Sequence, residues 1–198
     1  MDTQQQDVPL RHDDALIVVD VQNDFLPGGR LAVPHGDEIV PVLNAYIDRF
    51  VSKALPVFAT RDWHPAGHCS FRERGGPWPP HCIAGTKGAA FASGLSLLPQ
   101  VRVLGKAMQH NREAYSGFDG TDLAGQLRQR GVRRVFIGGL ATDYCVFSTV
   151  KDALKEGFAT VLLRDAVLAV DVRPGDGEAS IGEMRRLGAR LACLEEIR

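Results

Sequence analysis

The sequence lacks the features that mark several protein classes. No apolar run approaches the roughly 20 residues that a membrane-spanning helix needs, and residues 1–6 are polar, unlike a signal peptide. Lys and Arg number 23 against 24 Asp and Glu, so there is no basic excess to attract nucleic acid. The four cysteines form no CxxC pair. We therefore expect a cytoplasmic protein with reduced thiols that binds neither nucleic acid nor a membrane.

Three common motifs of nucleotide-binding proteins and hydrolases are also missing. Residues 138–142 (GGLAT) do not match GxGxxG, and residues 84–87 (AGTK) lack the spacing of a Walker loop. No GxSxG nucleophile elbow is present. The sequence therefore gives no reason to expect a dinucleotide, a P-loop nucleotide or a serine nucleophile of that type.

Short apolar runs alternate with amphipathic helical patterns along the chain. The runs cover residues 15–19, 56–60, 101–104, 135–137, 160–163 and 190–194. Because runs that are apolar on both faces suit buried parallel strands, we predict a doubly wound, mostly parallel six-stranded α/β sheet with helices on both faces. We predict one domain over residues 15–198, preceded by a polar leader at residues 1–14.

Residues 61–100 break this alternation. They are rich in Gly, Pro, His and Trp and show little periodicity. A long segment without regular structure in a compact domain is usually functional. Polar or reactive residues also follow the first four apolar runs, where an α/β sheet binds its ligands. They are Asp20, Asp62 with His64, Lys106, and the segment that ends at Cys145.

Cys145 is a candidate nucleophile. It follows the fourth predicted strand and opens a helix that Thr142 or Asp143 could cap. The helix dipole would lower the pKa of the thiol. A cysteine at this position is nevertheless more often a small packing residue. Cys193, by comparison, is expected in a buried strand.

Asp20 and Lys106 are candidate partners of that thiol. The Asp20 carboxylate could act as a general base, and the Lys106 ammonium could keep a thiolate or Asp20 ionised. The alternatives are a loop-capping aspartate and a solvated lysine.

One carboxylate and several imidazoles gather in the irregular segment. Asp62 and His64 are followed by His68 and by His81. Such ligands suit Zn²⁺, Fe²⁺ or Mn²⁺, and three of them would leave coordination positions open. A polar loop with scattered histidines is the alternative.

Six motifs in this order resemble the nicotinamidase (pyrazinamidase) branch of the isochorismatase-like cysteine hydrolases. They are ALIVVDVQNDF (15–25), TRDWHP (60–65), WPPHC (78–82), GK (105–106), YSGF (115–118) and GLATDYC (139–145). The likeness extends from about residue 15 to residue 194. It implies a hydrolase that converts nicotinamide to nicotinic acid and ammonia, and pyrazinamide to pyrazinoic acid, in NAD salvage.

The resemblance also implies a role for each matching residue. Asp20, Lys106 and Cys145 would form the catalytic triad, and the N–H groups of Ala141 and Cys145 the oxyanion hole, with a cis peptide before Ala141. The implied substrate contacts are Phe25, Trp78 and Tyr115. The implied metal ligands are Asp62, His64 and His81, holding one divalent ion that binds the pyridine nitrogen, with zinc preferred over iron or manganese. His68 matches a ligand of only some relatives and is left out.

Two alternatives stay open. A related hydrolase of isochorismate-like or carbamoyl substrates would use the same triad but generally no metal. A non-catalytic binding protein could keep the fold. The oligomeric state is open as well, a homo-oligomer included, and residues 107–113 follow no recognised pattern.

Overall fold

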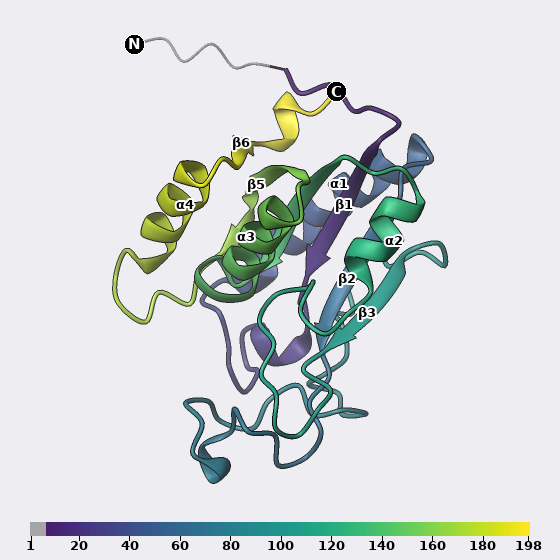
Figure 1. The fold of residues 1–198 in the computed structure, drawn as a ribbon. Helices are drawn as coiled ribbons and strands as arrows, with labels where there is room; N and C mark the ends of the chain where they lie inside the picture. Colours follow the sequence, from purple (N-terminus) through teal and green to yellow (C-terminus); the bar gives the residue numbers. More distant parts are fainter. Residues whose placement is uncertain (1–6) are drawn as a thin grey trace.

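The computed structural model describes residues 7–198, and the first six residues of the predicted leader lie outside this range. Six parallel strands form one sheet in the order β3-β2-β1-β4-β5-β6 (Figure 1). They are β1 (Asp14–Val19), β2 (Val57–Asp62), β3 (Arg102–Lys106), β4 (Arg134–Leu140), β5 (Ala159–Leu168) and β6 (Arg190–Ala192). The predicted six-stranded α/β sheet is confirmed, and β4 and β5 continue past their apolar runs.

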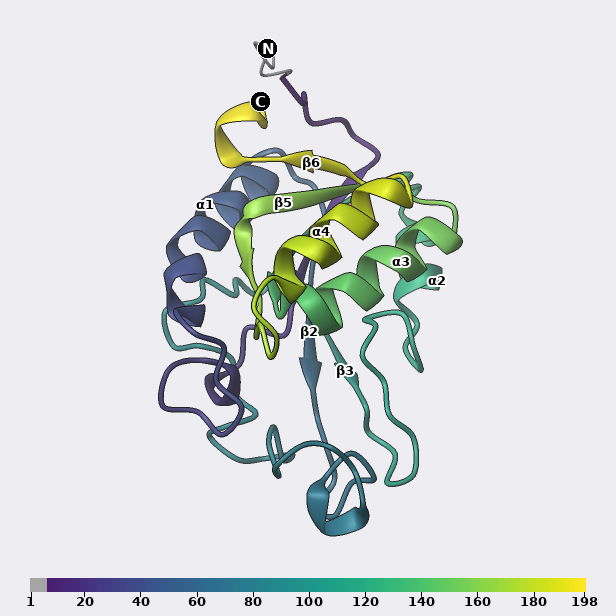
Figure 2. The ribbon, with the colours of Figure 1, turned by 90° about the vertical axis from the view of Figure 1, so that its left-hand side faces the viewer.

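Helices cover both faces of the sheet. Helix α1 (Ile39–Ser52) lies on one face, and the other carries α2 (Leu123–Gln129), α3 (Phe147–Lys155) and α4 (Asp176–Arg186) (Figure 2). Glycine residues follow the carboxyl ends of two of these helices. Gly131 after α2 and Gly157 after α3 have φ of 69° and 85°, a conformation that glycine adopts without steric cost.

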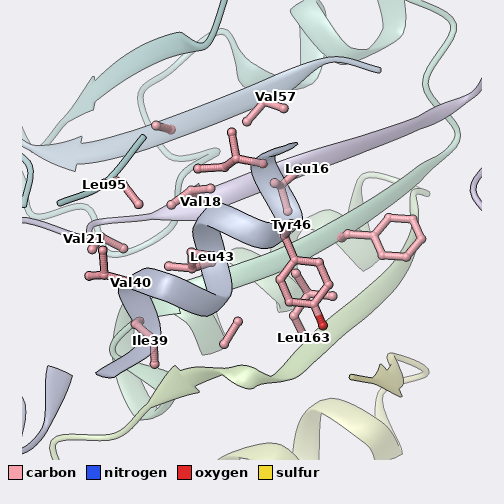
Figure 3. Close-up of a cluster of buried hydrophobic side chains, with 14 of the residues drawn as sticks. Leu16, Val18, Val21, Ile39, Val40, Leu43, Tyr46, Val57, Leu95 and Leu163 are labelled. Carbon is pink, nitrogen blue, oxygen red and sulfur yellow. The ribbon is translucent and has the colours of Figure 1, made fainter. Parts of the chain in front are cut away.

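Each face of β1 packs into its own layer of apolar side chains. All six residues of the strand are buried. Leu16 and Val18 face α1, where Leu43 and Tyr46 lie in the same cluster (Figure 3). Ile17 belongs to the opposite layer, under α2, α3 and α4. This two-sided burial explains why residues 15–19 of the strand are all apolar.

The strand order places a switch point between β1 and β4. The chain leaves β1 toward β2 and β3 on one side, whereas β4, β5 and β6 extend to the other. Ligands of such sheets bind beyond the carboxyl ends of the strands at this point. Asp20 directly follows β1, and a π-helical turn, Thr142–Val146, follows β4. The first and fourth strands thus deliver their polar residues to one crevice.

The connection between β2 and β3 is irregular, as predicted. It contains a single short 3-10 helix, Arg72–Arg74, and isolated bridges such as His64 to Ile83. In Figure 1 it forms much of the lower end of the molecule, beyond the carboxyl ends of β1 and β2. Within residues 7–198, every helix is too short or too polar to span a lipid bilayer.

The structure differs from the sequence-based expectation at Cys193 and adds a buried contact at Val8. Cys193 was predicted to lie in a buried strand, but β6 ends at Ala192 and Cys193 is only partly buried. The sequence pattern was wrong there because an apolar run near a chain end need not be paired along its whole length. Val8, inside the predicted leader, is fully buried and bridges Ile197.

Candidate active site

The three predicted catalytic side chains meet at the switch point. The Lys106 ammonium lies 3.0 Å from Asp20 Oδ2 and 3.5 Å from Cys145 Sγ. A carboxylate oxygen of Asp20 lies within 4.8 Å of Cys145 Sγ. Asp20 directly follows β1, Lys106 ends β3, and Cys145 lies in the turn that follows β4, so the sheet fixes their mutual placement. The arrangement places a thiol beside a carboxylate and a cation.

Asp20 is held by one of its two oxygens. Thr60, on β2, donates a hydrogen bond of 2.7 Å from its hydroxyl to Asp20 Oδ1. Oδ2 lies 3.0 Å from the Lys106 ammonium as an ion pair, but it accepts no hydrogen bond from the described residues. Oδ2 is therefore the oxygen that remains able to accept a proton.

Burial and the neighbouring charges set the protonation of this group of residues. Burial raises the pKa of Asp20 to about 6, against the lowering effects of Lys106 and Thr60. Although burial alone would lower the pKa of Lys106, Asp20 and Asp62 raise it well above its usual value. Near neutral pH the lysine is therefore charged, and Asp20 lies close to its titration range, as a general base requires.

The surroundings of Cys145 differ from the sequence-based expectation in two ways. Burial raises the pKa of the thiol, and although Lys106 lowers it, Asp20 raises it further. The predicted lowering of this pKa is wrong because burial penalises the thiolate and the nearby carboxylates add to that effect. Neither Thr142 nor Asp143 caps the turn. Asp143 instead accepts hydrogen bonds from the backbone N–H groups of residues 170 and 171.

Asp62, His64 and His81 form a second cluster next to the triad. One ligand atom of each lies within 4.8 Å of the other two, and all three residues are buried. His64 Nδ1 is 3.0 Å from the carbonyl of His81, and His81 Nδ1 is 2.8 Å from that of Pro79. Each Nδ1 therefore donates, which leaves both Nε2 atoms as lone-pair donors. Such outer hydrogen bonds orient metal-binding histidines, so the residues fit a divalent ion.

His68 is bonded differently from those two histidines. The Ser70 N–H donates to His68 Nδ1 at 3.2 Å, so Nε2 carries the proton and donates to the Arg112 carbonyl at 2.9 Å. Both ring nitrogens are in use.

A cavity opens over both clusters. Its walls include the predicted substrate contacts Phe25, Trp78 and Tyr115, together with Cys145 and Ala141. The Trp78 indole donates a 2.9 Å hydrogen bond to the Tyr115 hydroxyl, which fixes the two rings relative to each other. The peptide between Leu140 and Ala141 is cis, as predicted. The structure thus brings every predicted site residue to this cavity or directly behind it.

Two supporting residues, Gln22 and Phe71, were not singled out from the sequence. The Gln22 amide accepts a hydrogen bond from the Asp62 N–H at 2.7 Å and donates to the Asp62 carbonyl at 2.8 Å. The Phe71 ring packs against the imidazoles of His64, His68 and His81. Gln22 follows Asp20 by two residues, so its proximity could have been anticipated. Nothing in the sequence separates Phe71 from other apolar residues.

The cavity also has walls that sequence reasoning missed. They are Leu31, Val33, Glu113, Tyr144 and Val170. Four of these side chains are apolar or aromatic, which suits a flat ring. The fifth, Glu113, brings a carboxylate from the segment that had no recognisable pattern.

The chain is similar to known proteins over most of its length. Residues 14–196 match the isochorismatase domain. The chain is 40% identical over 187 residues to the nicotinamidase/pyrazinamidase of Mycobacterium tuberculosis, covering 90% of this chain and 98% of that protein. The pyrazinamidase of Pyrococcus horikoshii, solved in complex with zinc, is 52% identical with a TM-score of 0.89, covering 92% and 99%. PnC1 from L. infantum, in complex with nicotinate, is 39% identical with a TM-score of 0.88, covering 96% and 98%.

Proposed function

Because this chain belongs to the isochorismatase domain family, we propose that it is a metal-dependent amidohydrolase that converts nicotinamide to nicotinic acid and ammonia. Pyrazinamide would be converted to pyrazinoic acid in the same way. The observation that carries the proposal is one cavity shared by a cysteine beside an Asp–Lys pair and an Asp/His/His cluster. The names of the similar proteins, which include nicotinamidases and a nicotinate complex, support the same substrate.

The pocket recognises the pyridine ring by its faces and by its nitrogen. Phe25 and Trp78 lie on the cavity wall and would stack on the ring, and Tyr115 borders it. Asp62, His64 and His81 would hold the divalent ion, with zinc as first choice, as in the similar Pyrococcus protein. When bound, the ion supplies a Lewis-acid position for the ring nitrogen.

The first half of the reaction forms a thioester. Asp20 Oδ2 accepts the thiol proton of Cys145 as the sulfur attacks the amide carbonyl carbon, while Lys106 offsets the added negative charge. The N–H groups of Ala141 and Cys145 would donate to the developing oxyanion. The tetrahedral adduct then breaks its C–N bond, and Asp20 returns the proton to the leaving ammonia.

The second half is hydrolysis of that thioester. Water adds to the acyl carbon, and Asp20 accepts its proton. The C–S bond breaks, the proton returns to Cys145, and nicotinic acid leaves. Asp20 thus acts as base and acid in turn, which a pKa of about 6 permits near neutral pH.

The biological setting is also a proposal. Hydrolysis of nicotinamide would place the chain in NAD salvage, with a small amide as its ligand. The four free cysteines support the reducing cytoplasm as its location.

One combined experiment tests this function. Ammonia release from nicotinamide is measured on the purified chain alongside its metal content, and the acyl-enzyme is sought by intact-mass analysis after acid quenching. We expect turnover, about one divalent ion per chain, and an added mass that disappears when Cys145 is replaced by alanine. Absence of ammonia release from the metal-loaded chain would refute the proposal.

A further inference from the structure

Glu113 is the one carboxylate of the cavity that the mechanism above does not use. It lines the same cavity as Asp62, His64 and His81. A carboxylate oxygen of Glu113 lies within 4.8 Å of a nitrogen of His64 and of a nitrogen of His68. Ligands of one metal ion are typically about 3 to 4 Å apart, given metal–ligand bonds near 2.1 Å. The Glu113 carboxylate therefore lies close to the position of an ion held by His64.

The backbone on both sides of Glu113 is fixed by buried residues of the site. His68 Nε2 donates to the Arg112 carbonyl at 2.9 Å, and the Lys106 ammonium donates to the Ala114 carbonyl at 3.0 Å. The Ala114 N–H donates to Glu113 Oε1 at 3.0 Å, which leaves Oε2 for another partner. The segment that follows β3 is thus held at two points, with Glu113 between them.

The charges of the site favour a further carboxylate. Lys106 donates to Asp62 Oδ1 at 2.5 Å, so the only carboxylate of the Asp/His/His cluster already shares its charge with a cation. With a divalent ion bound, the two aspartates leave one positive charge on the buried group of Asp20, Asp62, Lys106 and the ion. The negative charge of Glu113 offsets it, and uncompensated buried charge is costly.

Another group of possible metal ligands in the site already has its negative charge offset by a cation. Asp20, Asp62 and Cys145 lie close enough together to bind an ion. The Lys106 ammonium already contacts all three, at 3.0, 2.5 and 3.5 Å, and takes the place of a cation there. Among residues 7–198, no lysine or arginine forms an ion pair with Glu113. A bound metal ion would therefore be the cation that pairs with Glu113.

We propose that Glu113 is the fourth protein group of the metal centre, and that His68 is a positioning residue that holds the Arg112–Glu113 backbone for it. The inference rests on the proposed function, because it takes a divalent ion at Asp62, His64 and His81 as given. It assigns a role to the segment between β3 and the YSGF motif.

Metal affinity tests this inference independently of turnover. The apparent Kd for Zn²⁺ and Mn²⁺ is measured by chelator competition on the wild-type chain and on Glu113→Gln, which preserves shape and removes the charge. Glu73→Gln, at an exposed position in the same half of the molecule, is the matched control. We expect Glu113→Gln to weaken binding by about 10- to 100-fold, and Glu73→Gln to leave it unchanged.

A second readout reports on coordination directly. The visible absorption of bound Co²⁺ depends on its ligand number, and we expect it to change in Glu113→Gln but not in Glu73→Gln. Unchanged affinity and unchanged Co²⁺ absorption in Glu113→Gln would overturn the role of Glu113. His81→Ala, which removes a proposed metal ligand, serves as the control that distinguishes an error in this inference from an error in the proposed function. If His81→Ala loses metal and Glu113→Gln does not, only the present inference is wrong, whereas no binding by the wild-type chain removes both.

Discussion

Lys106 connects the two halves of the site, because its ammonium hydrogen-bonds Asp62 Oδ1 at 2.5 Å from within the catalytic cluster. Asp62 is at once a proposed metal ligand and a partner of the proposed catalytic lysine. Burial opposes ionisation of Asp62, but Lys106, His64 and His81 together outweigh burial and lower the pKa of that carboxyl. Substitution of Asp62 should therefore affect the catalytic lysine directly, whereas substitution of His64 or His81 should affect only metal binding.

This relationship predicts different behaviour for two metal-site variants. His81→Ala removes one ligand and should weaken metal binding and raise KM, with recovery of much of the activity at excess metal. Asp62→Asn also removes one of the two carboxylate partners of Lys106, so we expect its kcat to stay low at any metal concentration. Activity is titrated with Zn²⁺ for both variants, and thermal unfolding is recorded to verify the fold. Equal rescue of the two variants would contradict the dual role of Asp62.

Cys145→Ala should abolish amide hydrolysis without unfolding the chain. The thiol is the only proposed group that bonds covalently to substrate, and loss of a nucleophile commonly lowers kcat by on the order of 10³-fold or more. Cys193→Ala is the control, because that thiol is free, partly buried and outside the cavity. Ammonia release and circular dichroism are measured on both. Turnover near the wild-type rate in Cys145→Ala would remove the thioester mechanism.

The acidic limb of the pH–rate profile should report Asp20. The carboxylate accepts the thiol proton only when ionised, so kcat/KM is expected to fall as pH drops through about 6, the raised pKa of this buried group. Thr60→Val removes the hydrogen bond that lowers this pKa, and the limb should move to higher pH. Thr60→Ser, which keeps the hydroxyl, should retain the wild-type profile.

Thr160→Val is a second control for that experiment. This threonine, on β5, is also buried in the sheet, but its hydroxyl donates to the carbonyl of Phe158, which precedes β5, away from the site. Any loss of activity that it shares with Thr60→Val reflects stability alone. If the pH profile of Thr60→Val coincides with that of the wild type, the Thr60 hydrogen bond does not influence the pKa of Asp20.

The sheet and the residues at its strand ends were predictable, because two-sided burial leaves a local signature. The run before Asp20 is apolar at every position, and its end marks where a polar side chain enters the crevice. The Thr60–Asp20 hydrogen bond was not predictable, since it joins residues 40 positions apart and needs the register of β1 against β2.

Protonation was the part of the site that sequence reasoning described least well. The local pattern around Cys145 indicated a thiol favoured as thiolate, but a turn at a helix start is a local feature and burial is a tertiary one. The surrounding layers remove Cys145 from water, and this desolvation raises its pKa. Glu113 was missed for a related reason. Its place in the cavity depends on two carbonyl contacts, from His68 and Lys106, that no short motif encodes.

A comparison of substrates tests whether the metal ion bound by Asp62, His64 and His81 recognises the ring nitrogen. Benzamide keeps the aromatic plane and the amide of nicotinamide but has C–H in place of that nitrogen, so stacking on Phe25 and Trp78 would remain and the metal contact would be lost. A site built around one polar contact rejects an analogue that lacks it by large factors, because its own group is left unpaired. We expect kcat/KM for nicotinamide to exceed that for benzamide by on the order of 10²-fold or more, and pyrazinamide to be accepted. All three amides are compared on metal-loaded chain, and equal values for nicotinamide and benzamide would refute nitrogen recognition while leaving the cysteine mechanism intact.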